Sequence, residues 1–233
     1  MTRRTRHLIW AFAGIVVFSA IAILVKSGMT TAVDDAGLRW MTTIRGPMAT
    51  RVALFITRIG SGVILIPVGV MTTAWLLRLG RKPDGWLYLG TTLAGWAIYG
   101  ILKAAFARPR PSLIPRLSQA GWWSFPSGHS MASMVVLGLA AILLTRSRLA
   151  RLATLGLILA IVFSRVYLGV HYPSDVVAGL AAGAACISVA LAVREVEPIL
   201  LEHQLKEEIA QHHQGPGAGT APADRTTGAG GGP

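Results

Sequence analysis

Three polar clusters interrupt an otherwise apolar stretch of the chain: KAAFARPRP at residues 103–111, PSGH at residues 126–129 and SRVYLGVHYPSD at residues 164–175. Each cluster lies beside an apolar segment that is long enough to enter a membrane. Basic and acidic side chains are costly beside lipid, so their default interpretation at such positions is functional. The clusters therefore indicate both how the chain folds and where its function resides.

The composition is that of an integral membrane protein. Of the 233 residues, 53% are hydrophobic and only 14% are charged, which is far from the composition of a soluble domain. A formal net charge of +12 would suggest nucleic-acid binding in a soluble protein. Here the basic residues occupy span ends and short loops, where they orient helices or face anionic lipid. We therefore expect the bilayer, and no nucleic acid, as a partner, and the sequence leaves the oligomeric state open.

Six segments approach the roughly 20 apolar residues that are needed to cross a bilayer. They run from about 8 to 26, 60 to 78, 86 to 105, 128 to 145, 150 to 170 and 175 to 193. The connection from about 28 to 58 mixes charged and apolar residues, which predicts short interfacial helices with a break at Gly46-Pro47. Its partial helical periodicity also fits a second span that begins well before residue 60. The predicted fold is all-α, an integral membrane bundle of six transmembrane helices.

The predicted six-span domain covers residues 8–193. Residues 1–7 precede it as a basic amino terminus, and the first apolar run is long for a signal peptide, so we expect an uncleaved span. Residues 194–210 are expected to form a cytoplasmic helical extension, and the Gly-, Ala-, Pro- and Thr-rich residues 211–233 a disordered tail. With the cluster residues set aside, the basic turns place both termini in the cytoplasm of a plasma-membrane protein.

The three clusters converge on one face of the predicted bundle. Lys103 ends the third span, and the PSGH cluster opens the fourth. Arg165 lies near the end of the fifth span, and residues 171–175 open the sixth. The ends of odd spans and the starts of even spans lie on the same side of a membrane. With cytoplasmic termini, that side is extracytoplasmic, and the active site is expected at the helix ends there.

Five residues of these clusters are suited to binding phosphate. Lys103, Arg110 and Arg165 supply cationic donors, and a guanidinium can bind two phosphoryl oxygens at once. Ser127 and Gly128 stand at the start of a helix, whose free amides and dipole favour an anion. We expect this set to hold a phosphoryl group and to stabilise the charge on its oxygens.

Two histidines and one aspartate remain, and they suit phosphoryl transfer. Asp175 lies four residues after His171 and can hydrogen-bond one ring nitrogen, which leaves the other nitrogen free to attack phosphorus. His129 can protonate the departing oxygen and later deprotonate water. The prediction is a phosphomonoesterase or diphosphatase with catalytic residues His171, His129 and Asp175, without a metal ion and without a cofactor.

The spacing Lys-x6-Arg-Pro, Pro-Ser-Gly-His and Ser-Arg-x5-His-x3-Asp resembles the three-part motif of the type 2 phosphatidic acid phosphatase superfamily, also called lipid phosphate phosphatases. The resemblance covers roughly residues 60–190, and every motif position is filled. It implies that His171 becomes phosphohistidine, that Asp175 orients it and that His129 is the acid. It also implies a lipid phosphate or diphosphate as substrate. Undecaprenyl diphosphate ranks first, with phosphatidylglycerol phosphate and phosphatidic acid as alternatives.

A different class of function is a membrane protein that binds or translocates a lipid phosphate without turnover. Replacement of His171, His129 or Asp175 would mark such a protein, and all three residues are present. The catalytic interpretation is therefore preferred.

Several neighbouring residues lie outside the motif positions. Arg108 and Arg116 are expected to be lipid-headgroup or loop charges. Ser164 is expected either to bind substrate or to serve the packing of its helix. Trp122 and Trp123 are expected to be membrane-interface residues rather than a clamp on a lipid chain.

Overall fold

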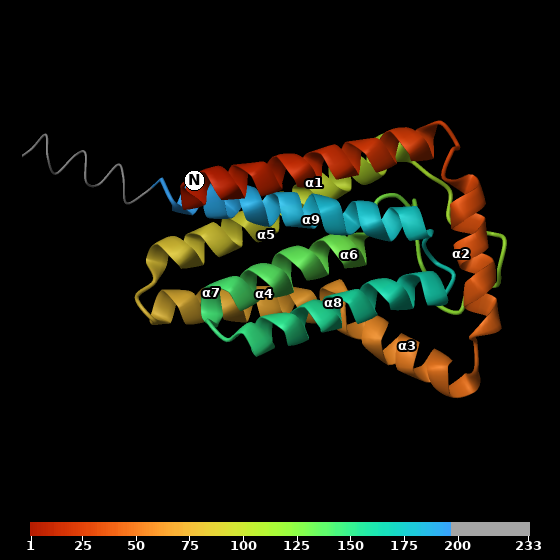
Figure 1. The fold of residues 1–233 in the computed structure, drawn as a ribbon. Coiled ribbons are helices and arrows are strands. Elements are labelled where there is room, and N and C mark those ends of the chain that lie inside the picture. Colours follow the sequence, from red (N-terminus) through yellow and green to blue (C-terminus); the bar gives the residue numbers. More distant parts are fainter. Residues whose placement is uncertain (197–233) are drawn as a thin grey trace, which may run out of the picture. The chain divides into compact units, whose positions relative to one another are not determined.

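The computed structural model describes residues 1–196, and within that range the chain is helical, with no strand (Figure 1). The helices are α1 (Arg3–Lys26), α2 (Thr31–Thr43), α3 (Pro47–Ile59), α4 (Gly62–Arg78), α5 (Lys82–Phe106), α6 (Gly128–Ser133), α7 (Leu139–Leu144), α8 (Arg148–Tyr167) and α9 (Pro173–Arg194). A π-helical turn, η1 (Met134–Gly138), joins α6 to α7. The predicted all-α class is confirmed. The predicted helical extension lies outside the described residues from residue 197 on, as does the predicted tail 211–233.

Among the described helices, α1, α5, α8 and α9 are long and apolar enough to cross a membrane. The pair α3 and α4, bent by 40° at the break between them, adds a fifth candidate span if the two are counted together. The continuous helix Gly128–Leu144 is apolar but has fewer than 18 residues. The chain is thus a multi-pass membrane protein with four or five candidate spans, and the count of six stays a prediction.

The connection between the first two predicted spans contains two helices. α2 ends at Thr43, and α3 begins at Pro47, so the chain breaks at the Gly46-Pro47 position that the sequence indicates. Proline suits the first turn of a helix because that turn leaves its backbone N–H groups unpaired. α3 then continues into α4 across Gly60, which fits the alternative of a second span that begins well before residue 60.

Glycines set the distance between α9 and its neighbours. A Cβ atom on Gly179 would lie 2.6 Å from the Ser127 carbonyl oxygen, and one on Gly183 would lie 2.8 Å from the Met134 Cβ. On the other side of α9, a Cβ on Gly14 of α1 would lie 3.0 Å from the Ala181 carbonyl oxygen. Small residues let helix backbones approach closely in a membrane. They allow α9 to pack against both α1 and the helix that begins with α6.

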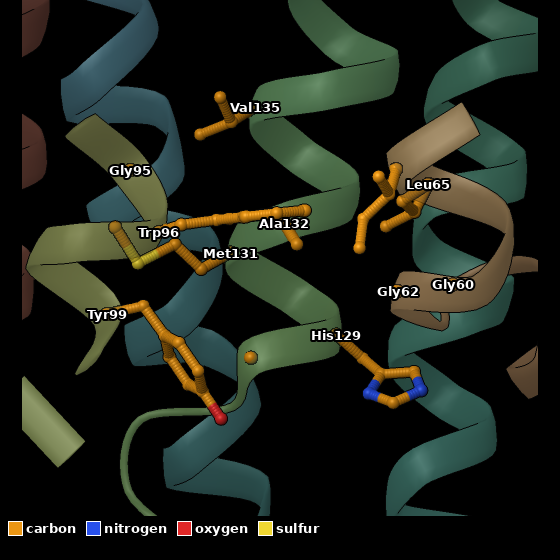
Figure 2. Close-up of a pocket in the computed structure, with 12 residues that line it drawn as sticks. Gly60, Gly62, Leu65, Gly95, Trp96, Tyr99, His129, Met131, Ala132 and Val135 are labelled. Carbon is orange, nitrogen blue, oxygen red and sulfur yellow. The ribbon is translucent and has the colours of Figure 1, made fainter. Parts of the chain in front are cut away.

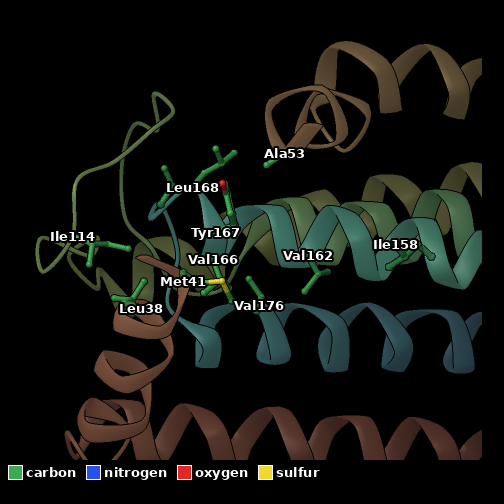
Figure 3. Close-up of a cluster of buried hydrophobic side chains, with 11 residues drawn as sticks. Leu38, Met41, Ala53, Ile114, Ile158, Val162, Val166, Tyr167, Leu168 and Val176 are labelled. Atoms are coloured by element: carbon green, nitrogen blue, oxygen red, sulfur yellow. The ribbon is translucent and has the colours of Figure 1, made fainter. Parts of the chain in front are cut away.

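α2 crosses the end of the bundle at which α8 stops and α9 begins (Figure 1). Buried apolar side chains join these elements: Leu38 and Met41 of α2 pack in one cluster with Val166 of α8 and Val176 of α9 (Figure 3). Gly37 lies so close to Pro173 that an added Cβ would be 2.6 Å from the proline ring. α2 is therefore packed directly against the first turn of α9.

Ion pairs tie the opposite end of the bundle together. The Asp84 carboxylate at the start of α5 accepts hydrogen bonds from Arg81 at 2.7 Å and from Arg194 at 2.6 Å. Arg81 also donates to the carbonyl of Leu143 at 2.8 Å. These contacts connect the α4–α5 turn to the ends of α7 and α9.

Replacing Gly14 by Leu is expected to separate α1 from α9, because the new side chain has no space at that contact. We expect the free energy of unfolding to fall by roughly 1–3 kcal/mol, the usual cost of overpacking. Thermal unfolding of the detergent-solubilised protein followed by circular dichroism measures the change. Gly156→Leu on α8 is the matched control, since a Cβ at Gly156 meets no atom within 4 Å. Equal destabilisation by the two variants would contradict the role given to Gly14.

Candidate active site

Hydrogen bonds join the three polar clusters at the end of the bundle that α2 crosses. The Lys103 ammonium, in the last turn of α5, donates to the carbonyl of Pro126 at 3.3 Å. The backbone N–H of Ser127 donates to the carbonyl of Asp175 at 3.0 Å. Arg110 reaches the turn between α8 and α9, where one of its N–H groups donates to the Val170 carbonyl at 2.6 Å. The structure therefore brings together the clusters that the parity of the spans places on one face.

The tautomer of His171 follows from its two contacts. Nη1 of Arg110 lies 3.2 Å from Nε2 of His171. A guanidinium can only donate hydrogen bonds, so Nε2 must offer its lone pair there. The proton then sits on Nδ1, which faces Oδ2 of Asp175 at 3.4 Å. The imidazole thus directs its unprotonated nitrogen toward the cationic side of the site.

Burial keeps the His171 imidazole neutral. The side chain is 2% exposed, and this desolvation lowers the pKa of His171 to about 4, although its hydrogen bond to Asp175 acts in the opposite direction. The positive charges of Arg110 and Arg165 add to the lowering. At neutral pH the ring is therefore in the form that can act as a nucleophile.

Asp175 both faces His171 and caps α9. Its Oδ2 accepts a hydrogen bond from the backbone N–H of Tyr172 at 2.9 Å, and its own N–H donates to the Tyr172 carbonyl at 3.1 Å. Pro173 occupies the first position of the helix, where a proline is well tolerated. This capping arrangement fixes the carboxylate at the helix start.

The three predicted phosphate-binding cations are held by different segments. Lys103 is buried and lies over the Tyr99 ring, with its nitrogen 4.9 Å from the ring centroid. Arg165 is buried and donates to the Thr57 hydroxyl at 2.5 Å, while its Nε has no hydrogen-bond partner in the described part of the chain. Burial lowers the pKa of Arg110, whose Nη2 donates to the Gly121 carbonyl at 2.8 Å. A buried donor without a partner is suited to an anion bound beside it.

Ser127 and Gly128 begin α6 as predicted. The Ser127 hydroxyl accepts from the backbone N–H of Ser130 at 3.4 Å, which caps the helix. A Cβ on Gly128 would lie 2.6 Å from the Tyr99 ring. A side chain at position 128 would therefore displace the Tyr99 ring, a contact that the sequence motifs do not indicate.

His129 lines a cavity of about 400 Å³ between α4, α5 and α6. Figure 2 shows the imidazole at one end of this cavity, with Tyr99 across from it and Leu65 and Trp96 along the walls. The remaining lining is glycine, alanine, valine, isoleucine and methionine. One polar end and an apolar remainder are suited to a ligand that carries a phosphate on a hydrocarbon chain.

Arg108 lies inside the site, which corrects its assignment as a headgroup or loop charge. Its guanidinium pairs with Asp175 and with Asp34 of α2, each at 2.7 Å. Burial by itself would lower the pKa of Arg108, but these two carboxylates outweigh it and raise the pKa above its ordinary value. No motif position signals either Arg108 or Asp34, because the contact joins segments that are far apart in the sequence.

The other neighbouring residues behave in different ways. Arg116 donates to the Pro111 carbonyl at 2.9 Å within its loop. The Ser164 hydroxyl is buried and donates to the Ile161 carbonyl of its own helix at 2.6 Å, which favours a packing role. Trp122 and Trp123 border a second hollow, of about 450 Å³, that reaches Lys103. Their placement at the membrane interface stays a prediction.

Comparison with known proteins identifies the family. Residues 84–197 match the model of the PAP2 superfamily, a range that includes all three clusters. The chain is also 30% identical over 174 residues to phosphatidylglycerophosphatase B of Bacillus subtilis, which covers 71% of this chain and 85% of the relative. The chain belongs to the PAP2 superfamily. The resemblance stated from the sequence motifs is thereby confirmed.

Two further PAP2 matches bear on fold and activity. The crystal structure of a transmembrane PAP2-type phosphatidylglycerolphosphate phosphatase from Bacillus subtilis superposes with a TM-score of 0.74 at 25% identity, covering 79% of this chain and 96% of the other. The undecaprenyl-diphosphatase BcrC of Bacillus subtilis is 30% identical over 119 residues, 48% of this chain and 58% of the relative. The relatives of this chain are membrane phosphatases that act on lipids.

Proposed function

We propose that this PAP2 protein hydrolyses the terminal phosphate of a lipid phosphate or diphosphate through a phosphohistidine on His171. The observation that carries the proposal is the contact between Arg110 and Nε2 of His171. It implies an unprotonated nitrogen beside cations that can hold the oxygens of a phosphoryl group. The roles of these residues rest on this geometry and on the family motif.

The proposed reaction has two steps. In the first, Nε2 of His171 bonds to phosphorus while the bond from phosphorus to the lipid oxygen breaks, and His129 gives that oxygen its proton. In the second, His129 takes a proton from water, the water oxygen bonds to phosphorus, and the nitrogen–phosphorus bond breaks to release phosphate. Lys103, Arg110 and Arg165, with the Ser127 hydroxyl and the backbone N–H of Gly128, would hold the phosphoryl oxygens in both steps.

The apolar cavity supports a lipid as the substrate. His129 stands at its polar end, so a leaving group whose hydrocarbon chain lies in the cavity would carry its oxygen next to the proposed acid. A protein that only binds or translocates lipid phosphate has no need of an acid at this position. Release of inorganic phosphate from a lipid phosphate distinguishes the two functions.

His171→Ala is expected to lower the rate of phosphate release by at least about a thousandfold, because the nucleophile is lost. Acid-labile phosphate should be trapped on the wild-type protein by rapid quenching, and not on the variant. Activity is expected to persist in the presence of EDTA, since the proposed charge stabilisation comes from lysine and arginine side chains. His7→Ala, near the start of α1, is the control and should keep the wild-type rate. A wild-type rate in the His171→Ala protein would rule out this mechanism.

Two lipids are the leading substrate candidates. Analogy with the family ranks undecaprenyl diphosphate first, and the match to an undecaprenyl-diphosphatase supports it. The phosphatidylglycerophosphatase matches over a larger share of both chains, and a solved structure of that activity superposes on most of this chain. We therefore propose phosphatidylglycerophosphate as the first substrate to test and undecaprenyl diphosphate as the second.

Purified protein assayed in detergent micelles on phosphatidylglycerophosphate, undecaprenyl diphosphate and phosphatidic acid is expected to show the highest kcat/KM for phosphatidylglycerophosphate. Specificity is a difference in kcat/KM, so the three lipids are best compared at equal mole fraction in one detergent. A higher kcat/KM for undecaprenyl diphosphate would restore the ranking that analogy with the family gives. Absence of phosphate release from all three would contradict the lipid phosphatase proposal itself.

We further propose that the site faces the extracytoplasmic side of the plasma membrane, with the amino terminus inside. Support comes from the basic residues at the opposite end, in the amino-terminal segment 3–6, the α4–α5 turn and the α7–α8 turn. In a Cys186→Ser background, Gln119→Cys should react with an impermeant maleimide in right-side-out vesicles. Arg146→Cys should react only after the vesicles are opened. The reverse pattern of labelling would invert the proposed orientation.

A further inference from the structure

A buried carboxylate on α2 makes its hydrogen bonds to the start of α9 and to the loop after α5. Asp34 is 1% exposed. Its Oδ1 accepts from the backbone N–H of Ser174 at 2.9 Å, and its Oδ2 accepts from the Ser174 hydroxyl at 2.7 Å. Oδ2 also accepts from Nη2 of Arg108 at 2.7 Å. All these partners lie at the edge of the proposed active site.

Arg108 links this carboxylate to the one that faces the nucleophile. Its Nη1 donates to Oδ1 of Asp175 at 2.7 Å and to the Ser174 hydroxyl at 2.8 Å, and its guanidinium carbon lies 4.0 Å from the centroid of the Tyr172 ring. The other oxygen of Asp175 faces His171. A continuous chain of contacts therefore runs from Asp34 through Arg108 and Asp175 to His171.

We propose that Asp34 and Arg108 are positioning residues that set the orientation and charge of Asp175, and through it the reactivity of His171. This inference rests on the proposed role of His171 as the nucleophile. Asp175 has two oxygens, and Arg108 holds one while the other faces the imidazole. Because Asp34 also binds Arg108, one residue of α2 helps to position the catalytic groups, although α2 contributes no residue to the family motif.

The charge balance of this chain determines how each substitution should act. Arg108 is the cation that the carboxylates of Asp34 and Asp175 share, and without it both would lose this positive partner. The positive charge of Arg108 favours the ionised form of Asp175, so its loss would let Asp175 take up a proton at a higher pH. A protonated Asp175 no longer accepts the Nδ1–H bond of His171. The charged and titratable groups that act on Asp175 or on its two partners are His171, Arg108, Asp34, Arg110, Lys103, Arg165 and Tyr172.

The test is a double-variant cycle of Arg108→Met and Asp34→Asn, read as the pH profile of kcat/KM on the lipid that the wild-type protein hydrolyses. Arg108→Met is expected to lower kcat by roughly 10- to 100-fold and to move the acid limb of the profile to higher pH. Asp34→Asn removes one carboxylate, so the double variant should have its acid limb back near the wild-type position and a higher kcat than Arg108→Met. A purely structural role predicts losses that multiply and an acid limb that does not move, and that result would overturn the proposal.

Arg108→Lys keeps the positive charge but loses the planar pair of N–H donors that binds Asp34 and Asp175. It is the variant to use if the Arg108→Met protein does not fold. It should lower kcat, leave KM within about twofold and keep the acid limb in place, since the charge is retained. A wild-type kcat in this variant would overturn the proposal. Thermal unfolding in detergent is recorded for each variant to show that the protein measured is folded.

The matched control uses a more exposed ion pair within α2. Asp35 and Arg39 are 3.9 Å apart, and the Arg39 side chain is 64% exposed. Asp35→Asn and Arg39→Met should leave both kcat and the pH profile unchanged; a shift as large as that of Arg108→Met would overturn the proposal. A wild-type protein that releases no phosphate from any lipid contradicts the proposed function. An active wild type with an Arg108→Met variant of unchanged rate and profile contradicts only this inference.

Discussion

The structure depends on how it accommodates three positive side chains at the end of an apolar bundle. Lys103, Arg110 and Arg165 lie close together, and burying charge costs free energy unless polar groups replace the lost water. Hydrogen-bond acceptors that do so come from Pro126, Gly121, Trp122, Val170 and Thr57. These acceptors belong to the loop after α5, to the α8–α9 turn and to α3, so the cations tie distant segments into one site. The positive charge that remains is what an oxyanion of phosphate would neutralise.

The same end of the bundle also offers an apolar cavity, and the two environments meet at His129. Glycines on both walls keep the cavity open: Gly60 and Gly62 at the α3–α4 break, and Gly95 on α5 (Figure 2). A Cβ on Gly60 would overlap an Ile161 methyl carbon and would lie 3.3 Å from the His129 ring. The bend between α3 and α4 and the position of the proposed acid are therefore coupled through one residue. We expect the hydrocarbon chain of a substrate to bind in the cavity and its phosphate to bind beside the cations, with the His129 imidazole between the two.

Patterns within short stretches of sequence predicted the helices and breaks that those same stretches determine. Long apolar runs indicated α1, α5, α8 and α9, and Gly46-Pro47 indicated the break before α3. Lys103 and His171 were predicted to lie on the same side of the membrane, because the order of the spans along the chain alone determines on which side each span ends. The Asp34–Arg108 pair could not be predicted, since its two residues are 74 positions apart and each resembles an ordinary interfacial charge. The π-helical turn at Met134–Gly138 has no signal that we recognise in the sequence.

The capping of α9 joins local order to chemistry. Asp175 closes the first turn of this helix by accepting the Tyr172 N–H, and the same oxygen faces His171. The first and last turns of helices are where local unfolding usually starts. Here, fraying of that turn would release the imidazole and uncouple Arg108 in the same event. A molecule in which the first turn of α9 has unfolded would therefore also lack an assembled active site. Hydrogen exchange at the amides of this turn would report on the fraction of molecules in which the site is assembled.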